Sequence, residues 1–151
     1  MRKLFQIAIL FTSTLVLSQD SRVFDNLKVN SKILNQERSY AVYLPAAYDS
    51  SERSYPVLYL LHGLGDDQTG WIILGDVQRI TDESINSGIS APMIIVMPDA
   101  NTGVTGYINY PDRDWFYEDF FFEELIPHVE SQYRIKKGKQ YRAISGLSMG
   151  G

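Results

Sequence analysis

One serine near the end of the chain has the sequence surroundings of a catalytic nucleophile. Ser148 lies between Gly146 and Gly150, which completes a Gly-x-Ser-x-Gly pattern. In serine hydrolases this pattern forms a sharp turn from a strand into a helix, where glycines let neighbouring backbones pass closely. The strained turn lifts the serine hydroxyl to where a base and a carbonyl carbon can reach it. An ordinary strand-to-helix turn can have the same spacing, so the pattern needs support from the rest of the chain.

A second glycine-containing loop could complete the chemistry of such a serine. It has the sequence His62-Gly63-Leu64-Gly65 and directly follows an apolar run. Attack of a serine on an ester creates a negatively charged oxygen, which two backbone N–H groups normally hold. We predict that the N–H groups of Leu64 and Met149 do this, while His62, Gly63 and Gly65 shape the loop. The alternative is an ordinary tight turn.

The base and acid of a catalytic triad are harder to place. In the fold that uses this kind of turn, the serine precedes an Asp or Glu, which precedes the catalytic His. The chain has two histidines, His62 and His128, and both precede Ser148. We therefore expect neither to be the base. We predict that residues 19–151 are the N-terminal part of a longer domain, and that this fragment alone is inactive and folds poorly.

The elements around these loops alternate between strands and helices. Two alternating segments at 22–34 and 38–44 predict an antiparallel pair of strands. Continuous apolar runs at 56–61 and 92–98 predict strands buried on both faces. Between and after them we predict a helix capped by Asp76 with Ile80 on its apolar face, a long loop at 99–114, a helix at 115–134 kinked by Pro127, and a strand at 141–145 that enters the serine turn. The pattern indicates an α/β fold with a doubly wound, mostly parallel sheet.

Composition restricts the partners and the compartment. The 151 residues carry a formal net charge of −4 and no basic run, which argues against a nucleic-acid partner. The absence of Cys excludes disulfides and a cysteine nucleophile. Arg2 and Lys3 precede a short apolar stretch, and residues 1–18 are predicted to be a secretory signal peptide rather than a membrane anchor. We therefore expect a secreted or periplasmic protein without a stable membrane span after cleavage.

Aromatic residues near the loops could contribute to substrate binding. Trp71, Tyr107 and Tyr110 could stack on a sugar or an aromatic acyl group, although loop aromatics commonly cover the core. Acidic residues in the loops lack the spacing of an EF-hand. We predict no metal site and no cofactor, and the oligomeric state is left open.

Several segments together resemble one family of α/β-hydrolases, the "putative esterase" group. The resemblance rests on segments 59–63, 93–99, 124–134 and 142–151, with Trp71 between the first two. This family contains feruloyl and acetyl-xylan esterases, S-formylglutathione hydrolase (esterase D), enterochelin esterases and mycolyltransferases. The resemblance implies an α/β-hydrolase fold, Ser148 as the nucleophile, and the Leu64 and Met149 amides as the oxyanion hole. It also implies a catalytic Asp and His beyond Gly151.

The resemblance and the signal peptide together favour a serine esterase that removes feruloyl or acetyl groups from plant polysaccharide such as xylan. Its partner would then be an acylated carbohydrate or another small ester. Four alternatives stay open: an S-formylglutathione hydrolase, a siderophore esterase, an acyltransferase that uses the same serine, and an inactive carbohydrate-binding homologue.

Overall fold

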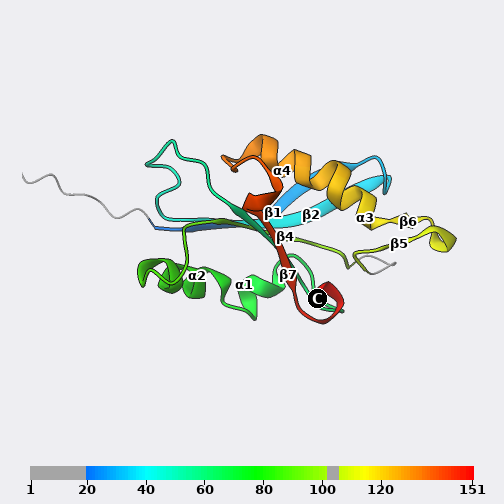
Figure 1. Ribbon diagram of the computed structural model, residues 1–151. Coiled ribbons are helices and arrows are strands. Elements are labelled where there is room, and N and C mark those ends of the chain that lie inside the picture. The colour runs from blue at the N-terminus through cyan, green and yellow to red at the C-terminus, as the bar shows by residue number, and fades with distance from the viewer. Residues whose placement is uncertain (1–19, 102–105) are drawn as a thin grey trace, which may run out of the picture.

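The computed structural model describes residues 20–101 and 106–151, which form a mixed sheet with helices on both faces (Figure 1). The signal peptide predicted at residues 1–18 lies outside the described residues. The five strands are, in spatial order, β1 (Arg22–Ser31), β2 (Gln36–Leu44), β4 (Ile94–Pro98), β3 (Val57–Leu61) and β7 (Arg142–Gly146). This order confirms the α/β fold that the sequence indicates.

The first two strands form the antiparallel part of the sheet. β1 pairs with β2, and β2 pairs with β4, both in antiparallel register. β1 ends at Ser31, three residues earlier than the alternating pattern suggests, because residues 32–35 form the connecting turn with Asn35 in a left-handed conformation. Asparagine tolerates that conformation better than most residues. The predicted strand pair is confirmed.

The other three strands form the parallel part, which carries both candidate loops. β3 lies between β4 and β7 and is parallel to each of them. Parallel strands end at the same edge, so the segment after Leu61 and the segment after Gly146 emerge side by side. β7 forms an edge of the described sheet, and residues 142–145 are exposed.

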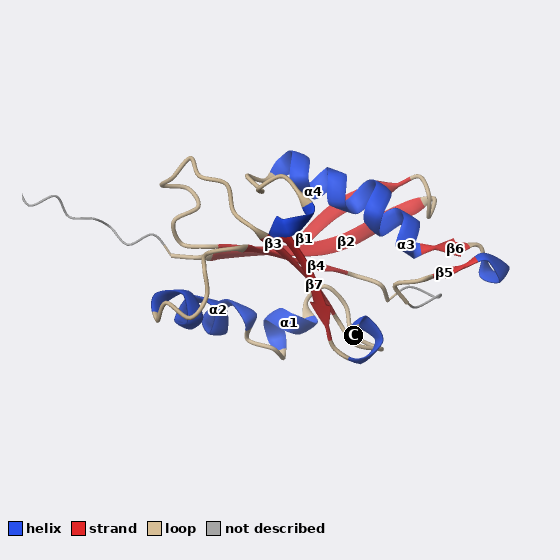
Figure 2. Cartoon of the chain, viewed as in Figure 1, coloured by secondary structure: helices blue, strands red, loops and turns tan. Residues whose placement is uncertain are grey.

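Helices cover each face of the sheet (Figure 2). α1 (Gly70–Ile73) and α2 (Val77–Asn86) lie on one face, where Tyr43, Ile95 and Met97 are buried. α3 (Tyr117–Asp119), η2 (Phe120–Leu125) and α4 (Ile126–Gln132) lie on the opposite face, over Tyr59 and Val96. Because successive strand residues point to opposite faces, covering both faces requires the continuous apolar runs seen in the sequence.

Helix α2 differs from its predicted form at two residues. Asp76 precedes the helix in a left-handed conformation, and its carboxylate makes no cap. It accepts a hydrogen bond from Arg79 Nε at 2.5 Å instead. Ile80 is 51% exposed, while Val77 and Thr81 are buried. Val77 and Thr81 are four residues apart and form the buried stripe of the helix, and Ile80 lies at the margin of that stripe. The predicted cap and the predicted role of Ile80 are wrong.

The segment from Trp115 to Arg134 is also more varied than one kinked helix. Trp115–Phe116 form β6, which pairs with β5 (Asn109–Tyr110), and η1 (Pro111–Arg113) connects the two. After α3 the chain forms a π-helical turn, in which Ile126 N–H donates to Phe121 O. Pro127 lacks an N–H, so it cannot bond to the carbonyl one turn earlier. The widened turn immediately precedes this proline, at the second position of α4.

The end of the described chain consists of short elements around β7. η3 (Lys139–Tyr141) precedes the strand, and η4 (Ser148–Gly150) follows it. Among the helices formed by residues 20–101 and 106–151, none has the length and apolar character needed to cross a membrane.

Candidate active site

Ser148 occupies a strained turn at the carboxyl end of β7. Its backbone φ of 55° lies in the left-handed region, which a serine adopts only at an energetic cost. Strand β7 ends two residues earlier, at Gly146, and a single helical turn begins at Ser148 itself. The residue is exposed to solvent. This is the geometry of the sharp strand-to-helix turn that the Gly-x-Ser-x-Gly pattern predicts.

The two glycines of the pattern lie against strand β3 with no room for a side chain. A Cβ atom on Gly150 would stand 2.5 Å from Leu61 Cβ, and one on Gly146 would stand 2.8 Å from Leu61 O. Real Cβ atoms essentially never approach other atoms below 3.0 Å. The Leu147 N–H also donates to Leu61 O at 3.2 Å. The turn is therefore held directly on the last residue of β3.

The loop after β3 lies next to the serine. A Cβ atom on Gly63 would be in ordinary contact with Ser148 Cβ, at 3.8 Å, and with Leu147 O, at 3.6 Å. Leu64 follows Gly63 and is 72% exposed, whereas Met149 is partly buried against the core. Gly65 adopts a φ of 82°, which glycine tolerates without strain. The structure thus brings Gly63 and Ser148, which are 85 residues apart in the sequence, together at one edge of the sheet.

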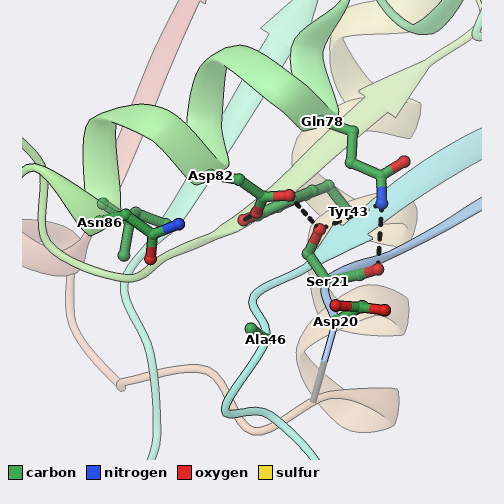
Figure 3. A pocket seen from close by; sticks show the side chains of 8 residues that line it. Asp20, Ser21, Tyr43, Ala46, Gln78, Asp82 and Asn86 are labelled. Carbon is green, nitrogen blue, oxygen red and sulfur yellow. Dashed lines mark hydrogen bonds between the residues drawn. The ribbon is translucent and has the colours of Figure 1, made fainter. Parts of the chain in front are cut away.

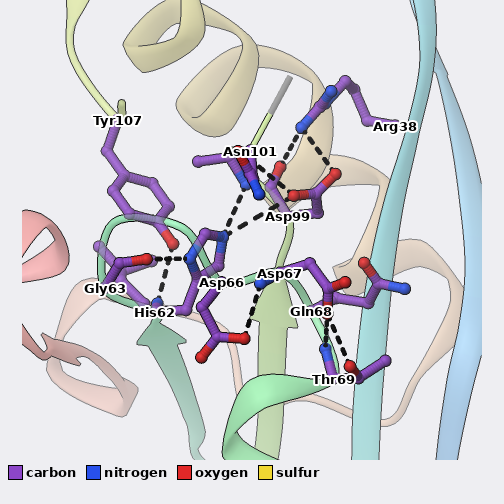
Figure 4. Close-up of polar contacts among 12 residues, drawn as sticks. Arg38, His62, Gly63, Asp66, Asp67, Gln68, Thr69, Asp99, Asn101 and Tyr107 are labelled. Atoms are coloured by element: carbon purple, nitrogen blue, oxygen red, sulfur yellow. Dashed lines mark hydrogen bonds and ion pairs between the residues drawn. The ribbon is translucent and has the colours of Figure 1, made fainter. Parts of the chain in front are cut away.

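His62 is buried beneath this loop, with 1% of its surface exposed (Figure 4). Its Nδ1 lies 2.7 Å from Gly63 O, and its Nε2 accepts a hydrogen bond from the Ala100 N–H at 3.0 Å. Its own backbone N–H donates to the Tyr107 hydroxyl at 2.8 Å. Both ring nitrogens therefore have partners within the protein. His128 lies elsewhere, on α4, with Nε2 3.1 Å from the Tyr40 hydroxyl.

Two residues that the sequence did not single out lie behind His62. Arg38, on β2, donates from Nη2 to the Asp99 carbonyl and to Asp99 Oδ2, the latter at 3.1 Å (Figure 4). Asp99 directly follows β4, and Tyr117 donates from its hydroxyl to the Asp99 carbonyl at 2.8 Å. Burial raises the pKa of Tyr117 well above its ordinary value, so this hydroxyl keeps its proton. The position of Asp99 at the carboxyl end of a buried strand was a usable signal, since such ends carry binding groups in α/β sheets.

The three aromatic candidates lie in different surroundings. Trp71 lines a cavity of about 170 Å³ together with Gly63 and Leu147, and its Nε1 donates to Leu61 O at 3.1 Å. Tyr107 lines another cavity of about 190 Å³, on the α3 side, and burial raises the pKa of its hydroxyl. Tyr110 lines neither of these two cavities and faces Arg113, whose guanidinium carbon is 5.3 Å from the ring centre.

A separate cavity of about 350 Å³ lies between α2 and the start of β1 (Figure 3). The Asp82 carboxylate accepts hydrogen bonds from the hydroxyls of Ser21, at 2.5 Å, and Tyr43, at 2.7 Å. Gln78 Nε2 donates to Ser21 Oγ and to the Ser21 carbonyl, both at 3.0 Å. These bonds attach the beginning of the sheet to α2, and the residues that line the cavity do not include any from the serine turn or the loop after β3.

The strained serine, its glycine contacts and the adjacent loop, at the carboxyl edge of a parallel sheet, define an α/β-hydrolase fold. The chain belongs to the family described as "Putative esterase", whose model matches residues 31–151.

Known relatives carry names consistent with this family. The chain is 36% identical over 118 residues to an endo-1,4-beta-xylanase/feruloyl esterase from Xylanibacter ruminicola, covering 73% of this chain and 16% of that protein. A solved ferulic acid esterase is similar with a TM-score of 0.82 and 40% identity, over 87% of this chain and 52% of that one. A serine-to-alanine mutant of the feruloyl esterase module from Clostridium thermocellum, complexed with sinapinate, has a TM-score of 0.69 and 29% identity, over 89% of this chain and 47% of that one. The chain therefore spans about half the length of these solved structures.

Proposed function

We propose that the full-length protein is a secreted serine esterase in which Ser148 is the nucleophile. The observation that carries the proposal is the left-handed Ser148, held on Leu61 by two glycines and exposed beside Gly63. Membership of the esterase family supports it. Export rests on the basic and apolar pattern of residues 1–18.

In the proposed reaction the Ser148 hydroxyl attacks the ester carbonyl, and the carbonyl oxygen becomes an oxyanion. The N–H groups of Leu64 and Met149 donate to this oxyanion; losing one such donor typically costs about 3 kcal/mol of transition-state stabilisation. The general base takes the serine proton and gives it to the leaving alcohol, and water then hydrolyses the acyl-enzyme.

The general base and its acid partner are proposed to come from a part of the protein outside this sequence. His62 is buried and has partners on both ring nitrogens. His128 lies on α4 against Tyr40. Neither position suits proton transfer from Ser148, which requires contact with the serine hydroxyl.

We further propose that the substrate is an acylated plant polysaccharide, with a feruloyl or an acetyl group as the acyl part. The names of the relatives support a feruloyl ester. The cavity of about 170 Å³ formed by Trp71, Gly63 and Leu147 beside the serine turn would suit an apolar group of the substrate. The Tyr107 hydroxyl is hydrogen-bonded to the His62 N–H, and Tyr110 does not line the cavity, so Trp71 is the aromatic candidate that the geometry favours.

The test is hydrolysis by the full-length protein and its Ser148→Ala variant. The assays use methyl ferulate, p-nitrophenyl acetate and acetylated xylan. We expect Ser148→Ala to abolish turnover of every ester, while Ser54→Ala, a matched change at an exposed serine in the loop before β3, leaves it unchanged. Retained turnover by Ser148→Ala would refute the proposal.

The four alternative functions can be distinguished by measuring hydrolysis of other esters, acyl transfer to a sugar, and binding of xylan oligomers. Faster hydrolysis of S-formylglutathione or enterochelin than of methyl ferulate would favour those substrates. Faster acyl transfer to an added sugar than to water would favour an acyltransferase. Binding of xylan oligomers without any hydrolysis would favour an inactive homologue.

A further inference from the structure

The orientation of the Leu64 N–H depends on the Gly63 carbonyl, because both belong to one peptide unit. A trans peptide is planar, and its C=O and N–H point in opposite directions. The Gly63 oxygen lies 2.7 Å from His62 Nδ1, and it accepts a hydrogen bond from the Asp66 N–H at 3.3 Å. Groups that hold this oxygen beneath the loop therefore aim the Leu64 N–H the other way.

The hydrogen-bond partner of His62 Nε2 shows which ring nitrogen of His62 carries the proton. The Ala100 N–H points at Nε2 from 3.0 Å. A backbone N–H can only donate, so Nε2 carries a lone pair and the ring proton is on Nδ1, where it is donated to Gly63 O. The Tyr107 hydroxyl holds the backbone of the same histidine at 2.8 Å. The ring of Tyr107 stands edge-on to the imidazole, with centroids 5.5 Å apart.

The position of Ala100 is set in turn by Asp99, which β2 and α3 hold. Arg38 of β2 donates to its carbonyl and its carboxylate, and Tyr117 of α3 donates to its carbonyl. The Asp99 N–H donates to Ser39 O at 3.0 Å. Because Arg38, Asp99 and Tyr117 are buried, bulk water does not compete for the bonds among them.

We propose that Asp99, His62 and Tyr107 form a positioning network that aims the Leu64 N–H at the oxyanion. The network acts on the backbone of the loop after β3, and it transfers no proton during the reaction. It acts by preventing rotation of the Gly63–Leu64 peptide unit, which lies next to Ser148. The inference rests on the proposed esterase function of the full-length protein.

A pair of substitutions at His62 tests the network through the Gly63 carbonyl. Asn places an amide N–H close to where Nδ1 stands and keeps a donor to Gly63 O, whereas Leu keeps the bulk and removes the donor. For His62→Leu we expect kcat to fall by about 10²–10³-fold with KM changed by less than about threefold. His62→Asn should recover at least about tenfold of that loss.

Tyrosine substitutions give a milder test that does not depend on folding of the His62 variants. Tyr107→Phe removes the acceptor of the His62 N–H and should lower kcat by about tenfold. Tyr48→Phe is the matched control, because the Tyr48 hydroxyl also accepts a backbone N–H, that of Arg134, at 3.0 Å. We expect its kcat to stay within about twofold of the wild-type value.

Three results would overturn the network. The first is a kcat of Tyr107→Phe equal to that of Tyr48→Phe. The second is a Tyr107→Phe variant in which KM changes and kcat does not. The third is an equal loss of kcat in folded His62→Leu and folded His62→Asn. The KM result would instead make Tyr107 a substrate contact. Ser148→Ala, measured in parallel, separates this failure from a failure of the esterase proposal, since only the latter leaves Ser148→Ala active.

Discussion

The contact between Gly150 and strand β3 allows a quantitative test of the serine turn. In Gly150→Ala the new Cβ would stand 2.5 Å from Leu61 Cβ and 2.9 Å from the Leu61 carbonyl, where ordinary contact begins at 3.4 Å. Strand β3 lies between β4 and β7 and cannot retreat without disturbing both. Because protein interiors are close-packed, the turn that carries Ser148 must therefore move by about 1 Å.

The displacement sets the size of the expected effects. A misplacement of about 1 Å can cost about 10²-fold in rate, which corresponds to roughly 2.7 kcal/mol of activation free energy. Overpacking of this kind costs about 1–3 kcal/mol of stability. Alanine recovers about 0.4–1 kcal/mol by restricting the unfolded chain, so a net loss of up to about 2.6 kcal/mol is expected.

The measurement is kcat for an aryl ester, together with the free energy of unfolding in urea, on the full-length protein. Gly88→Ala is the matched control. Gly88 follows α2 with a φ of 76°, and an added Cβ meets no atom within 4 Å. That control should lose about 1–2 kcal/mol of stability through backbone strain but keep its kcat. If Gly150→Ala kept kcat within about twofold, the reasoning that ties Ser148 to β3 would be refuted.

Three further changes test other parts of the structure. Arg38→Leu leaves the buried Asp99 without its charged partner, and we expect the free energy of unfolding to fall by about 3–5 kcal/mol in urea titrations. Trp71→Ala removes the aromatic wall of the cavity beside the serine, so KM for methyl ferulate should rise about tenfold relative to that for an acetyl ester. Burial, with two neighbouring tyrosines, raises the pKa of Tyr133 to about 12. A tyrosine is neutral below its pKa, and the unfolded chain ionises first, so the native state loses stability as the pH rises from about 10 towards 12. The free energy of unfolding of Tyr133→Phe, measured by urea titration at each pH, should therefore fall less over that range than that of the wild type.

The strands and the serine turn could be predicted because their signals are local. An apolar run such as 57–61 reports burial on both faces, and the spacing of Gly146, Ser148 and Gly150 reports a turn that few other residues permit. The helix after Trp115 was predicted less well, because periodicity does not distinguish an α-helical turn from a π-helical one before a proline.

The partners of His62 are a different case. The sequence alone determined which residues could form a nucleophile and an oxyanion loop, since glycine spacing and strand ends are properties of short segments. Only the tertiary structure decided that Arg38 and Asp99, 61 residues apart, meet behind that loop. A buried polar residue on a strand has the same sequence pattern as an exposed one, and its hydrogen-bond partner is chosen by the order in which distant strands pair.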